Sequence, residues 1–394
     1  MRVLSETPRS AELIVVGGGI VGAGTAFWCS RAGIPTLLME ARPALGQFTT
    51  AVAAGGYRLQ LDHEDELQLV SRSVDLFHRF AEETGQSRYD PDLRQQGYLW
   101  LTTDPARVEA QRALVDAQRS WGVAGVEHLS GDVARERFPW LSGDVVGARF
   151  RAGDGLLDPR SLTMGLAEGS DAGVLTSWPV DRILVRDGRV EGVAGPRGSV
   201  AADAVVVACG PLSAPLLRTA GVELPVRALR RQRLAVWGAP EIPADAPMTI
   251  DEDTTAHWRP TRFGAFGLFP DPAEAAGEPH DQVAADPAFA LRLLDPASDV
   301  ALARVAPFWH EVWERNTAQW AVQAGEYTMT PDQRPLIGPG PVEGLWINTG
   351  YSGHGVMASP AGSELLAGLL SGAASPAENP FHLDRTFVAS TQAF

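Results

Sequence analysis

The chain contains no lysine, because all 33 basic residues among its 394 are arginine. Lysine amines form Schiff bases and anchor pyridoxal, so mechanisms that need an amine side chain are excluded. Cysteine is almost absent as well: Cys29 and Cys209 are the only two, and both lie in apolar segments. We interpret them as buried thiols of a reducing compartment and not as a disulfide pair.

Positive charge is in deficit, and long apolar runs are missing. The net charge of -15 argues against nucleic acid and against an anionic membrane surface as partners. No window approaches the roughly 18 uncharged apolar residues of a membrane span, and the N-terminal segment lacks a signal-peptide core. We therefore expect a cytoplasmic protein. The histidines show no paired spacing, so we expect no metal site.

Glycine, by contrast, is abundant and ordered. Three glycines in G-x-G-x-x-G register follow a predicted strand at 13–16 and open a predicted helix at 20–32. A second predicted strand, 36–39, leads to Glu40. In a dinucleotide fold such glycines let the backbone approach a pyrophosphate, and the acidic residue binds a ribose hydroxyl. The sequence therefore predicts nucleotide binding, with a structural glycine turn as the alternative.

A second glycine-rich corner lies near the other end of the chain. A predicted strand at 345–348 leads into 350–355, which reads Gly-Tyr-Ser-Gly-His-Gly. Ser359 and Pro360 are typical of an N-cap and a first helical residue, so we expect a helix to begin at Pro360. Strand, corner and helix start together predict backbone N–H groups that face a bound anion.

Six sequence blocks, in this order and spacing, carry a family resemblance over nearly the whole chain. The blocks are VVGGGIVGAGTA…LLMEA, GQFTTAVAAGG, QQGYLWL, DGLLDPRSL, ADAVVVACGPLS and TPDQRPLIG…GYSGHG…SPAG. The chain resembles the FAD-dependent amino-acid oxidoreductases that include D-amino-acid oxidase, glycine oxidase and sarcosine oxidase. Members of the glycine oxidase and sarcosine oxidase types are the most similar.

The resemblance implies an FAD that extends from the N-terminal glycines to the C-terminal glycine corner. Sarcosine oxidases attach flavin through a cysteine in the strand before the Thr-Pro-Asp turn, and the corresponding segment here, 324–327, has none. We therefore expect noncovalent FAD. The residues that the resemblance places on the cofactor are Gly17, Gly19, Ile20, Val21, Gly22, Glu40, Ala41, Arg42, Thr49, Thr50, Gly55, Val180, Gly210, Gly353, His354, Gly355 and Val356.

The predicted fold class is α/β, with a discontinuous Rossmann-type FAD-binding domain and an α+β substrate domain that contains an antiparallel sheet. Only one dinucleotide fingerprint is present, which argues against nicotinamide as a co-substrate. Long helices are expected at 63–85 and at 309–320. The FAD-binding domain is assigned to residues 1–70, 155–225 and 325–394, and the substrate-binding domain to residues 71–154 and 226–324.

Amine oxidation in this family is a hydride transfer from the substrate α-carbon to flavin N5, so the protein has mainly to hold a carboxylate and shape a pocket. Without lysine, the carboxylate partner should be an arginine. The candidates are Arg58, Arg259 and Arg262, whereas Arg334 is interpreted as structural.

Four further residues are candidates for the substrate site. Tyr327 replaces an arginine of glycine oxidase, and Met357 replaces a lysine of sarcosine oxidase. His354 is expected to meet flavin or substrate, with a hydrogen bond at the helix entry as the alternative. Trp258 is a candidate pocket wall, with a place in the core as the alternative.

We expect an oxidase of an amino acid or an N-substituted glycine. The imine would hydrolyse to an amine and a 2-oxo acid such as glyoxylate, with hydrogen peroxide as the second product. One variant releases a β-amino acid from an N-carboxymethyl precursor in secondary metabolism. A dehydrogenase, a 2-hydroxy-acid oxidase and a flavin-binding subunit without turnover are alternatives. Expected partners are an amino-acid-type substrate and molecular oxygen. The sequence is compatible with a monomer and with a homo-oligomer.

Overall fold

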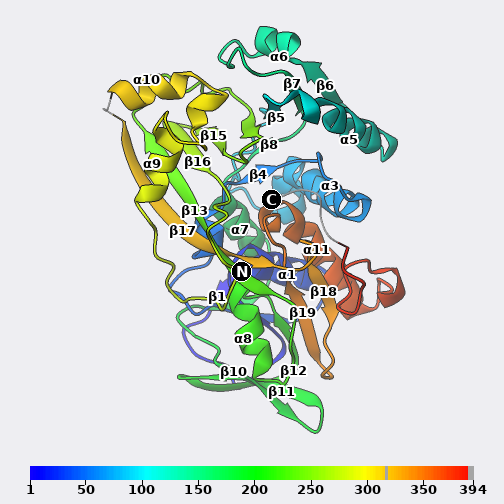
Figure 1. Cartoon of the computed structure of the whole chain (residues 1–394). Helices are drawn as coiled ribbons and strands as arrows, with labels where there is room; N and C mark the ends of the chain where they lie inside the picture. The colour runs from blue at the N-terminus through cyan, green and yellow to red at the C-terminus, as the bar shows by residue number, and fades with distance from the viewer. Residues whose placement is uncertain (316–317, 389–394) are drawn as a thin grey trace.

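The computed structural model describes residues 1–315 and 318–388. Two large β-sheets lie at opposite ends of the view, and α1, α7 and α11 lie between them (Figure 1). The nine-stranded sheet has the order β1-β9-β3-β2-β12-β11-β10, with β19 also beside β12 and β18 beside β19. Its strands are β1 (Arg2–Val3), β2 (Ser10–Val16), β3 (Thr36–Met39), β9 (Gly173–Leu175), β10 (Arg182–Arg186), β11 (Arg189–Gly195), β12 (Gly198–Val207), β18 (Leu336–Pro339) and β19 (Leu345–Thr349).

Parallel pairing aligns the strand ends of this sheet. β2 pairs in parallel with β3 and with β12, and β12 pairs in parallel with β19. Residues 13–16 of β2 are apolar and buried, as expected for a parallel strand covered on both faces. Because these four strands run in one direction, their carboxyl ends form a common edge, where ligands of open α/β sheets bind.

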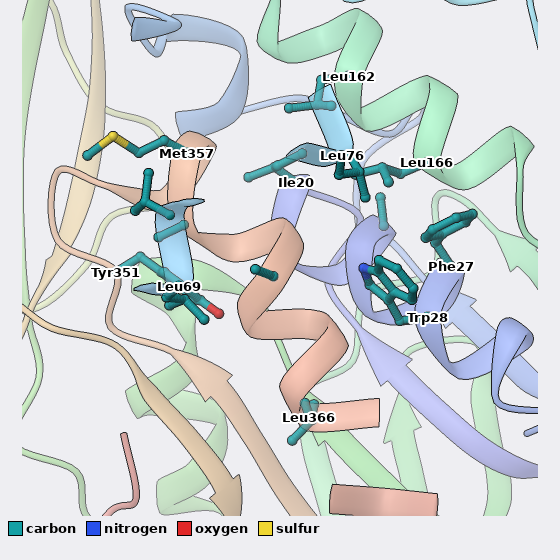
Figure 2. Packing of buried hydrophobic residues seen from close by; sticks show 14 of the residues in the cluster. Ile20, Phe27, Trp28, Leu69, Leu76, Leu162, Leu166, Tyr351, Met357 and Leu366 are labelled. Atoms are coloured by element: carbon teal, nitrogen blue, oxygen red, sulfur yellow. The ribbon is translucent and has the colours of Figure 1, made fainter. Parts of the chain in front are cut away.

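Helices cover the nine-stranded sheet and join into one apolar cluster. The helix α1 (Ile20–Arg31) packs on α7 (Pro159–Glu168) and on α11 (Gly355–Ser371), and α11 also packs on α3 (Glu64–His78). Figure 2 shows side chains of this cluster converging from α1, α3, α7 and α11, with Met357 at the start of α11. Burial of this cluster holds the glycine-rich start of α1 and the start of α11 in fixed positions.

The second sheet is mainly antiparallel and has the order β17-β13-β16-β15-β14-β5-β7-β6. β13 and β17 pair along their whole lengths, and a separate ribbon joins β4 (Gly56–Tyr57) to β8 (Gly155–Leu156). The strands of the second sheet are β5 (Tyr98–Thr102), β6 (Val126–Ser130), β7 (Gly147–Arg151), β13 (Arg227–Trp237), β14 (Met248–Asp251), β15 (His257–Thr261), β16 (Gly264–Leu268) and β17 (Gln319–Met329).

Among the remaining helices, α5 has 13 residues and the others are shorter. The remaining helices are α2 (Thr49–Val52), α4 (Phe80–Thr84), α5 (Val108–Ser120), α6 (Gly131–Arg137), α8 (Ser213–Arg218), α9 (Ala288–Leu294) and α10 (Phe308–Arg315), with 3-10 turns at Pro105–Arg107, Gly210–Leu212, Leu302–Arg304 and Pro376–Glu378. Within the described residues, no helix is both long enough and apolar enough to cross a membrane.

Two predicted helices differ from the structure. The helix expected to begin at Pro360 begins at Gly355, so Pro360 lies inside α11. Proline there lacks the N–H that would bond to residue 356, but the turn is held by the burial of neighbouring residues such as Met357. The helix expected over 63–85 is divided at Arg79 into α3 and α4.

The helix expected over 309–320 is wrong at its end. α10 ends at Arg315, residues 316 and 317 lie outside the described residues, and Trp320 belongs to β17. Trp320 pairs with Val236 in the long β13–β17 ladder. The ladder hydrogen bonds therefore outweigh the helical spacing of the tryptophans.

Candidate functional site

A cavity of about 470 Å³, here named the larger cavity, opens at the carboxyl ends of the parallel strands. Its lining includes the residues that directly follow β2, β3, β12 and β19, which are Gly17, Glu40, Ala208 and Gly350. Segments far apart in the sequence therefore meet at one edge of one sheet. This is the place where a dinucleotide binds in folds of this kind.

The N-terminus of α1 faces the larger cavity. Its cap residue is Gly19, which has no side chain that could cap the helix. The Ile20 N–H donates to Thr50 Oγ1 at 3.2 Å. The other N–H groups of the first turn and the helix dipole suit an anion such as a pyrophosphate. Gly22 permits close packing below this turn, because a Cβ there would overlap the Gly17 carbonyl oxygen.

Glu40 is held by the backbone beside the larger cavity. Its Oε2 accepts from the Gly18 N–H at 2.6 Å, and its Oε1 accepts from the Arg42 N–H at 2.7 Å. A carboxylate has about four lone-pair sites, so acceptor capacity remains for hydroxyl donors. The position and the remaining capacity of this carboxylate fit the ribose of a dinucleotide.

The loop between β16 and α9 covers part of the larger cavity. Asp281 and Gln282 line it, and Arg42 Nη2 donates to the Asp281 carbonyl oxygen at 2.9 Å. The neighbouring His280 lies with Nδ1 2.8 Å from Glu326 Oε1. The loop is thus attached to the cavity at two points, which sequence patterns did not indicate.

A second cavity of about 150 Å³, here named the smaller cavity, adjoins the larger one. Much of its wall is apolar and includes Trp100, Met248 and Ile250. A mostly apolar pocket with a few fixed polar groups is typical of small-molecule sites. The residues that line both cavities are Ile20, Thr49, Thr50, Tyr327, Ser352 and Gly355.

Arg58, His354 and Glu66 form a buried hydrogen-bonded array beside the smaller cavity. Arg58 Nη2 lies 3.1 Å from His354 Nε2, and His354 Nδ1 lies 2.5 Å from Glu66 Oε1. Because arginine only donates, Nε2 of His354 must accept, and its ring proton is on Nδ1 and is donated to Glu66. Arg58 follows β4, His354 is the cap residue of α11, and Glu66 lies in the first turn of α3. It fixes the direction of the Arg58 guanidinium.

The environment of Arg58 is dry and aromatic. Its guanidinium carbon lies 5.1 Å from the Trp100 ring centre, and Nη1 donates to the Gln60 carbonyl oxygen at 2.5 Å. Burial lowers the pKa of Arg58, although an arginine stays charged in proteins. A fixed cation in such a pocket is suited to a carboxylate.

Arg231 and His257 also line the smaller cavity, although neither is among the residues predicted for the substrate site. The Arg231 guanidinium carbon lies 5.7 Å from the Tyr327 ring centre. Burial, and to a smaller extent the charges of Arg231 and Arg58, lowers the pKa of His257 to about 4, so this histidine is neutral at pH 7. Alternation along β13 places Arg231 on the same face as Arg227 and Arg233, and this period of two was the available signal.

Most of the predicted cofactor and substrate residues line one of the cavities. Those at the larger cavity are Gly17, Gly19, Ile20, Val21, Glu40, Ala41, Arg42, Thr49, Thr50, Val180, Gly210, Tyr327 and Gly355. Those at the smaller cavity are Ile20, Thr49, Thr50, Gly55, Arg58, Tyr327, Gly353, His354, Gly355, Val356 and Met357. Gly22 lies beneath the first turn of α1.

Three predicted substrate residues lie outside both cavities. Trp258 is fully buried, with its ring 5.5 Å from that of Trp140, and belongs to the core of the second sheet. Arg259 lies over the Phe266 ring at 4.8 Å, and Arg262 is exposed in the turn between β15 and β16. The sequence pattern located this hairpin near the site without showing which residues face the cavity.

Neither cavity suggests a metal centre. Across residues 1–315 and 318–388, no group of three or more His, Cys, Asp or Glu side chains could hold a metal ion. The polar groups at the site are the arginines, histidines, hydroxyls and backbone N–H groups described above, together with the carboxylates of the larger cavity such as Glu40.

Comparison with known proteins gives a consistent result. Residues 12–369 match the family described as FAD dependent oxidoreductase. The chain is 28% identical to the glycine oxidase of Pseudomonas aeruginosa over 92% of this chain and 95% of that protein. It is also 28% identical to the mitochondrial dimethylglycine dehydrogenase of Rattus norvegicus, over 95% of this chain. The match covers 44% of that relative, so the chain spans less than half of its length.

Solved structures share the fold. The glycine oxidase from Geobacillus kaustophilus superposes with a TM-score of 0.82 at 23% identity, covering 96% of this chain and 100% of that chain. The L-proline dehydrogenase from P. horikoshii superposes with a TM-score of 0.80 at 24% identity, covering 94% of this chain and 96% of that chain. The predicted α/β fold class is confirmed by these similarities.

Proposed function

Because the chain belongs to the FAD dependent oxidoreductase family, we propose that it oxidises an amino acid or an N-substituted glycine in the manner of a glycine oxidase. The observation that carries the proposal is Arg58, a fixed guanidinium in an apolar cavity that adjoins the larger cavity. The smaller cavity is the substrate site, and its carboxylate partner is Arg58.

The larger cavity suits FAD through its own groups. The start of α1 takes the pyrophosphate, and Glu40 takes the adenosine ribose. We propose noncovalent attachment, because the segment 324–327, where sarcosine oxidases have a cysteine, contains none. In this segment a Cβ at Gly325 would lie 2.6 Å from Val52 Cγ2, so a side chain there requires Val52 to move.

The proposed reaction balances without a protein acid or base. The substrate α-carbon loses a hydride and the amine nitrogen loses a proton, which gives an imine. Water adds to the imine, and an amine and a 2-oxo acid separate; the acid is glyoxylate when the oxidised carbon belongs to a glycine unit. When bound, FAD supplies the acceptor for the hydride.

The residues of the chain bind and orient the substrate. Arg58 pairs with the carboxylate, and the apolar wall at Trp100, Met248 and Ile250 excludes water around the reacting carbon. His257, neutral at pH 7, adds no positive charge beside the reacting amine. Met357 leaves the pocket apolar where a related enzyme has a lysine.

The test is anaerobic flavin reduction of the purified holoenzyme by a panel of glycine, sarcosine, long N-alkylglycines, D-amino acids and 2-hydroxyglutarate. The proposal expects amines to bleach the flavin, and a bleach by the hydroxy acid alone would refute it. Arg58→Met should raise KM by about 10- to 100-fold, since a hydrogen-bonded ion pair is lost. An unchanged KM would remove Arg58 from the substrate site.

Similarity to glycine oxidases favours re-oxidation by oxygen with formation of hydrogen peroxide, and a dehydrogenase is the second candidate. The complete absence of lysine favours the dehydrogenase, because lysine activates oxygen in related oxidases. Relatives with dehydrogenase names, such as the D-amino acid dehydrogenase of Cereibacter sphaeroides at 30% identity, also favour it. Reduced enzyme exposed to air should re-oxidise within seconds as an oxidase, whereas re-oxidation only by an added dye would assign the dehydrogenase.

Strand membership supports the proposed division into an FAD-binding and a substrate-binding domain, with two adjustments. Residue 70 falls inside α3, which packs on α11, so we place that boundary after α4. The boundary at 324 falls inside β17, which pairs with β13 over its whole length, so we place this boundary after Met329. Limited proteolysis should cut at the loop boundaries first, and early cleavage inside α3 would contradict the adjusted division.

The biological setting is also a proposal. Cys29 and Cys209 are free thiols, which supports a reducing, cytoplasmic compartment. Thiol counting on protein quenched in cells should give two free thiols per chain, and a disulfide would contradict it. Release of a β-amino acid from an N-carboxymethyl precursor is a specific form of the same reaction, and the panel tests it through such precursors.

A further inference from the structure

The smaller cavity contains two arginines and no acid. Arg58 and Arg231 line it, and its lining includes no aspartate or glutamate. Among residues 1–315 and 318–388, no ion pair joins either guanidinium to a carboxylate. Arg58 contacts Gln60 and His354, and Arg231 donates from Nη1 to the Arg230 carbonyl oxygen at 3.3 Å. This is an excess of positive charge inside a protein of net charge -15.

Two other buried arginines are paired with carboxylates, whereas buried Arg233 donates, among the described residues, only to neutral oxygens of Ala51, Ala53 and Gln323 and lines neither cavity. Arg149 lies 2.7 Å from Glu252, and Arg385 lies 2.9 Å from Asp332. A buried charge without a charged partner costs free energy, and where such a charge lines a cavity a ligand of opposite charge can offset that cost. Burial also lowers the pKa of Arg231. Two such positions in one cavity therefore point to more negative charge than one carboxylate provides.

The two guanidiniums lie over aromatic rings from different strands of the second sheet. Arg231 is on β13 and lies over Tyr327 of β17, whereas Arg58 lies over Trp100 of β5. β16, β15 and β14 separate β13 from β5 in the sheet. Adjacent strands are about 5 Å apart, so the two side chains enter the cavity from different positions along the sheet. His257 of β15 lies between them in the sheet order.

We infer that the substrate carries two carboxylates, one bound by Arg58 and the other by Arg231, with the reacting amine between them. This inference rests on the proposed function, and it narrows the substrate class to amines that link two carboxylate-bearing arms. The reaction remains the one described above, in which the oxidised carbon and the nitrogen lose a hydride and a proton. The second carboxylate takes no part in bond making and serves to select the substrate.

Two unreactive probes test the inference by binding. (Methylthio)acetate has one carboxylate and thiodiacetate has two, and sulfur replaces the oxidisable nitrogen in both. Titration calorimetry on the holoenzyme should show that thiodiacetate binds about 10- to 100-fold more tightly, as expected for one additional charge-assisted pair. Arg231→Met should abolish this preference and leave (methylthio)acetate binding within about twofold. Arg58→Met should weaken both probes.

A matched control lies on the same strand. Arg227 is exposed and lines neither cavity, so Arg227→Met should preserve both affinities. Arg231→Lys should retain the preference for thiodiacetate, which supplies a second variant if Arg231→Met fails to fold. Circular dichroism and the Tm of each variant confirm folding.

Three results would overturn the inference. Equal affinities for the two probes in the wild type would show that one carboxylate is enough. An equal loss of both affinities in Arg231→Met would mean that Arg231 and Arg58 share one carboxylate. A changed flavin reduction potential with an unchanged probe ratio would assign Arg231 to the cofactor. Failure of the proposed function looks different, because no amine of either kind would then reduce the flavin.

Discussion

His354 Nδ1 lies 2.5 Å from Glu66 Oε1, so the imidazole that contacts Arg58 is oriented from the first turn of α3. Glu66 lines neither cavity, and it reaches the site through its hydrogen bond to His354 and through its charge near Arg58. The pair therefore connects a helix of the outer layer to the proposed carboxylate partner. Glu66 is a positioning residue in this arrangement.

Glu66→Gln should raise KM by about 3- to 10-fold with little change in kcat, because the charge that orients His354 is lost while the reacting atoms keep their neighbours. Steady-state kinetics and the 15N chemical shifts of the His354 ring check this. Glu64→Gln, on the exposed face of the same helix, is the control. Equal kinetics for the two variants would show that Glu66 is only structural.

Acid should destabilise the wild type through His257. Burial lowers its pKa from 6.5 to about 4 in the folded protein, so the unfolded chain takes up the proton first as the pH falls. This loss of unfolding free energy begins below about pH 6.5 and grows as the pH falls toward 4. Between pH 7 and 4.5, the unfolding free energy of the wild type should fall by on the order of 2 kcal/mol more than that of His257→Gln. Urea unfolding at both pH values measures this, and parallel losses would contradict it.

Introducing a cysteine into the segment 324–327, where sarcosine oxidases attach flavin, should fail to attach flavin at Gly325. In Gly325→Cys the new Cβ would lie 2.6 Å from Val52 Cγ2, and the overpacking should cost about 1–3 kcal/mol of unfolding free energy. Flavin should still be released by acid precipitation. Val52→Ala in the same chain should recover most of the loss, and a fully stable single variant with bound flavin would refute the steric argument.

Glu40→Gln should weaken FAD binding by about 10- to 100-fold, because an amide cannot accept from two backbone N–H groups and two hydroxyls at once. Fluorescence titration of the apoprotein with FAD measures the Kd. Glu6→Gln, an exposed change outside both cavities, serves as the comparison. A Kd that does not differ between the two variants would place the ribose elsewhere.

The nucleotide half of the site could be predicted in detail because its signals are local. The strand at 36–39 and Glu40 stand next to one another in sequence, and parallel pairing brings Glu40 to the common edge. The start of α11 was misplaced because Pro360 matches the statistics of a first helical residue. Its actual position depends on burial in the cluster around α11, which no local pattern contains.

The substrate half was predicted only in part because it depends on which face of a strand meets the cavity. Trp258 and His257 are adjacent in β15, yet one lies in the core and the other lines the smaller cavity. Arg58 was identified through its neighbourhood in a glycine-rich block. Glu66 was missed because its role depends on the meeting of α3 and α11, which are distant in sequence.

The long pairing of β13 with β17 has a consequence for how such enzymes diverge. Arg231 is paired with Gly325, and Leu229 with Tyr327, so one ladder presents side chains to both cavities. A change of side chain at position 231 leaves the ladder intact and can alter the accepted substrate in a single step. An inserted residue would exchange the two faces and disturb both cavities together. Substrate preference can therefore change by substitution at such positions, whereas the lengths of β13 and β17 must stay constant.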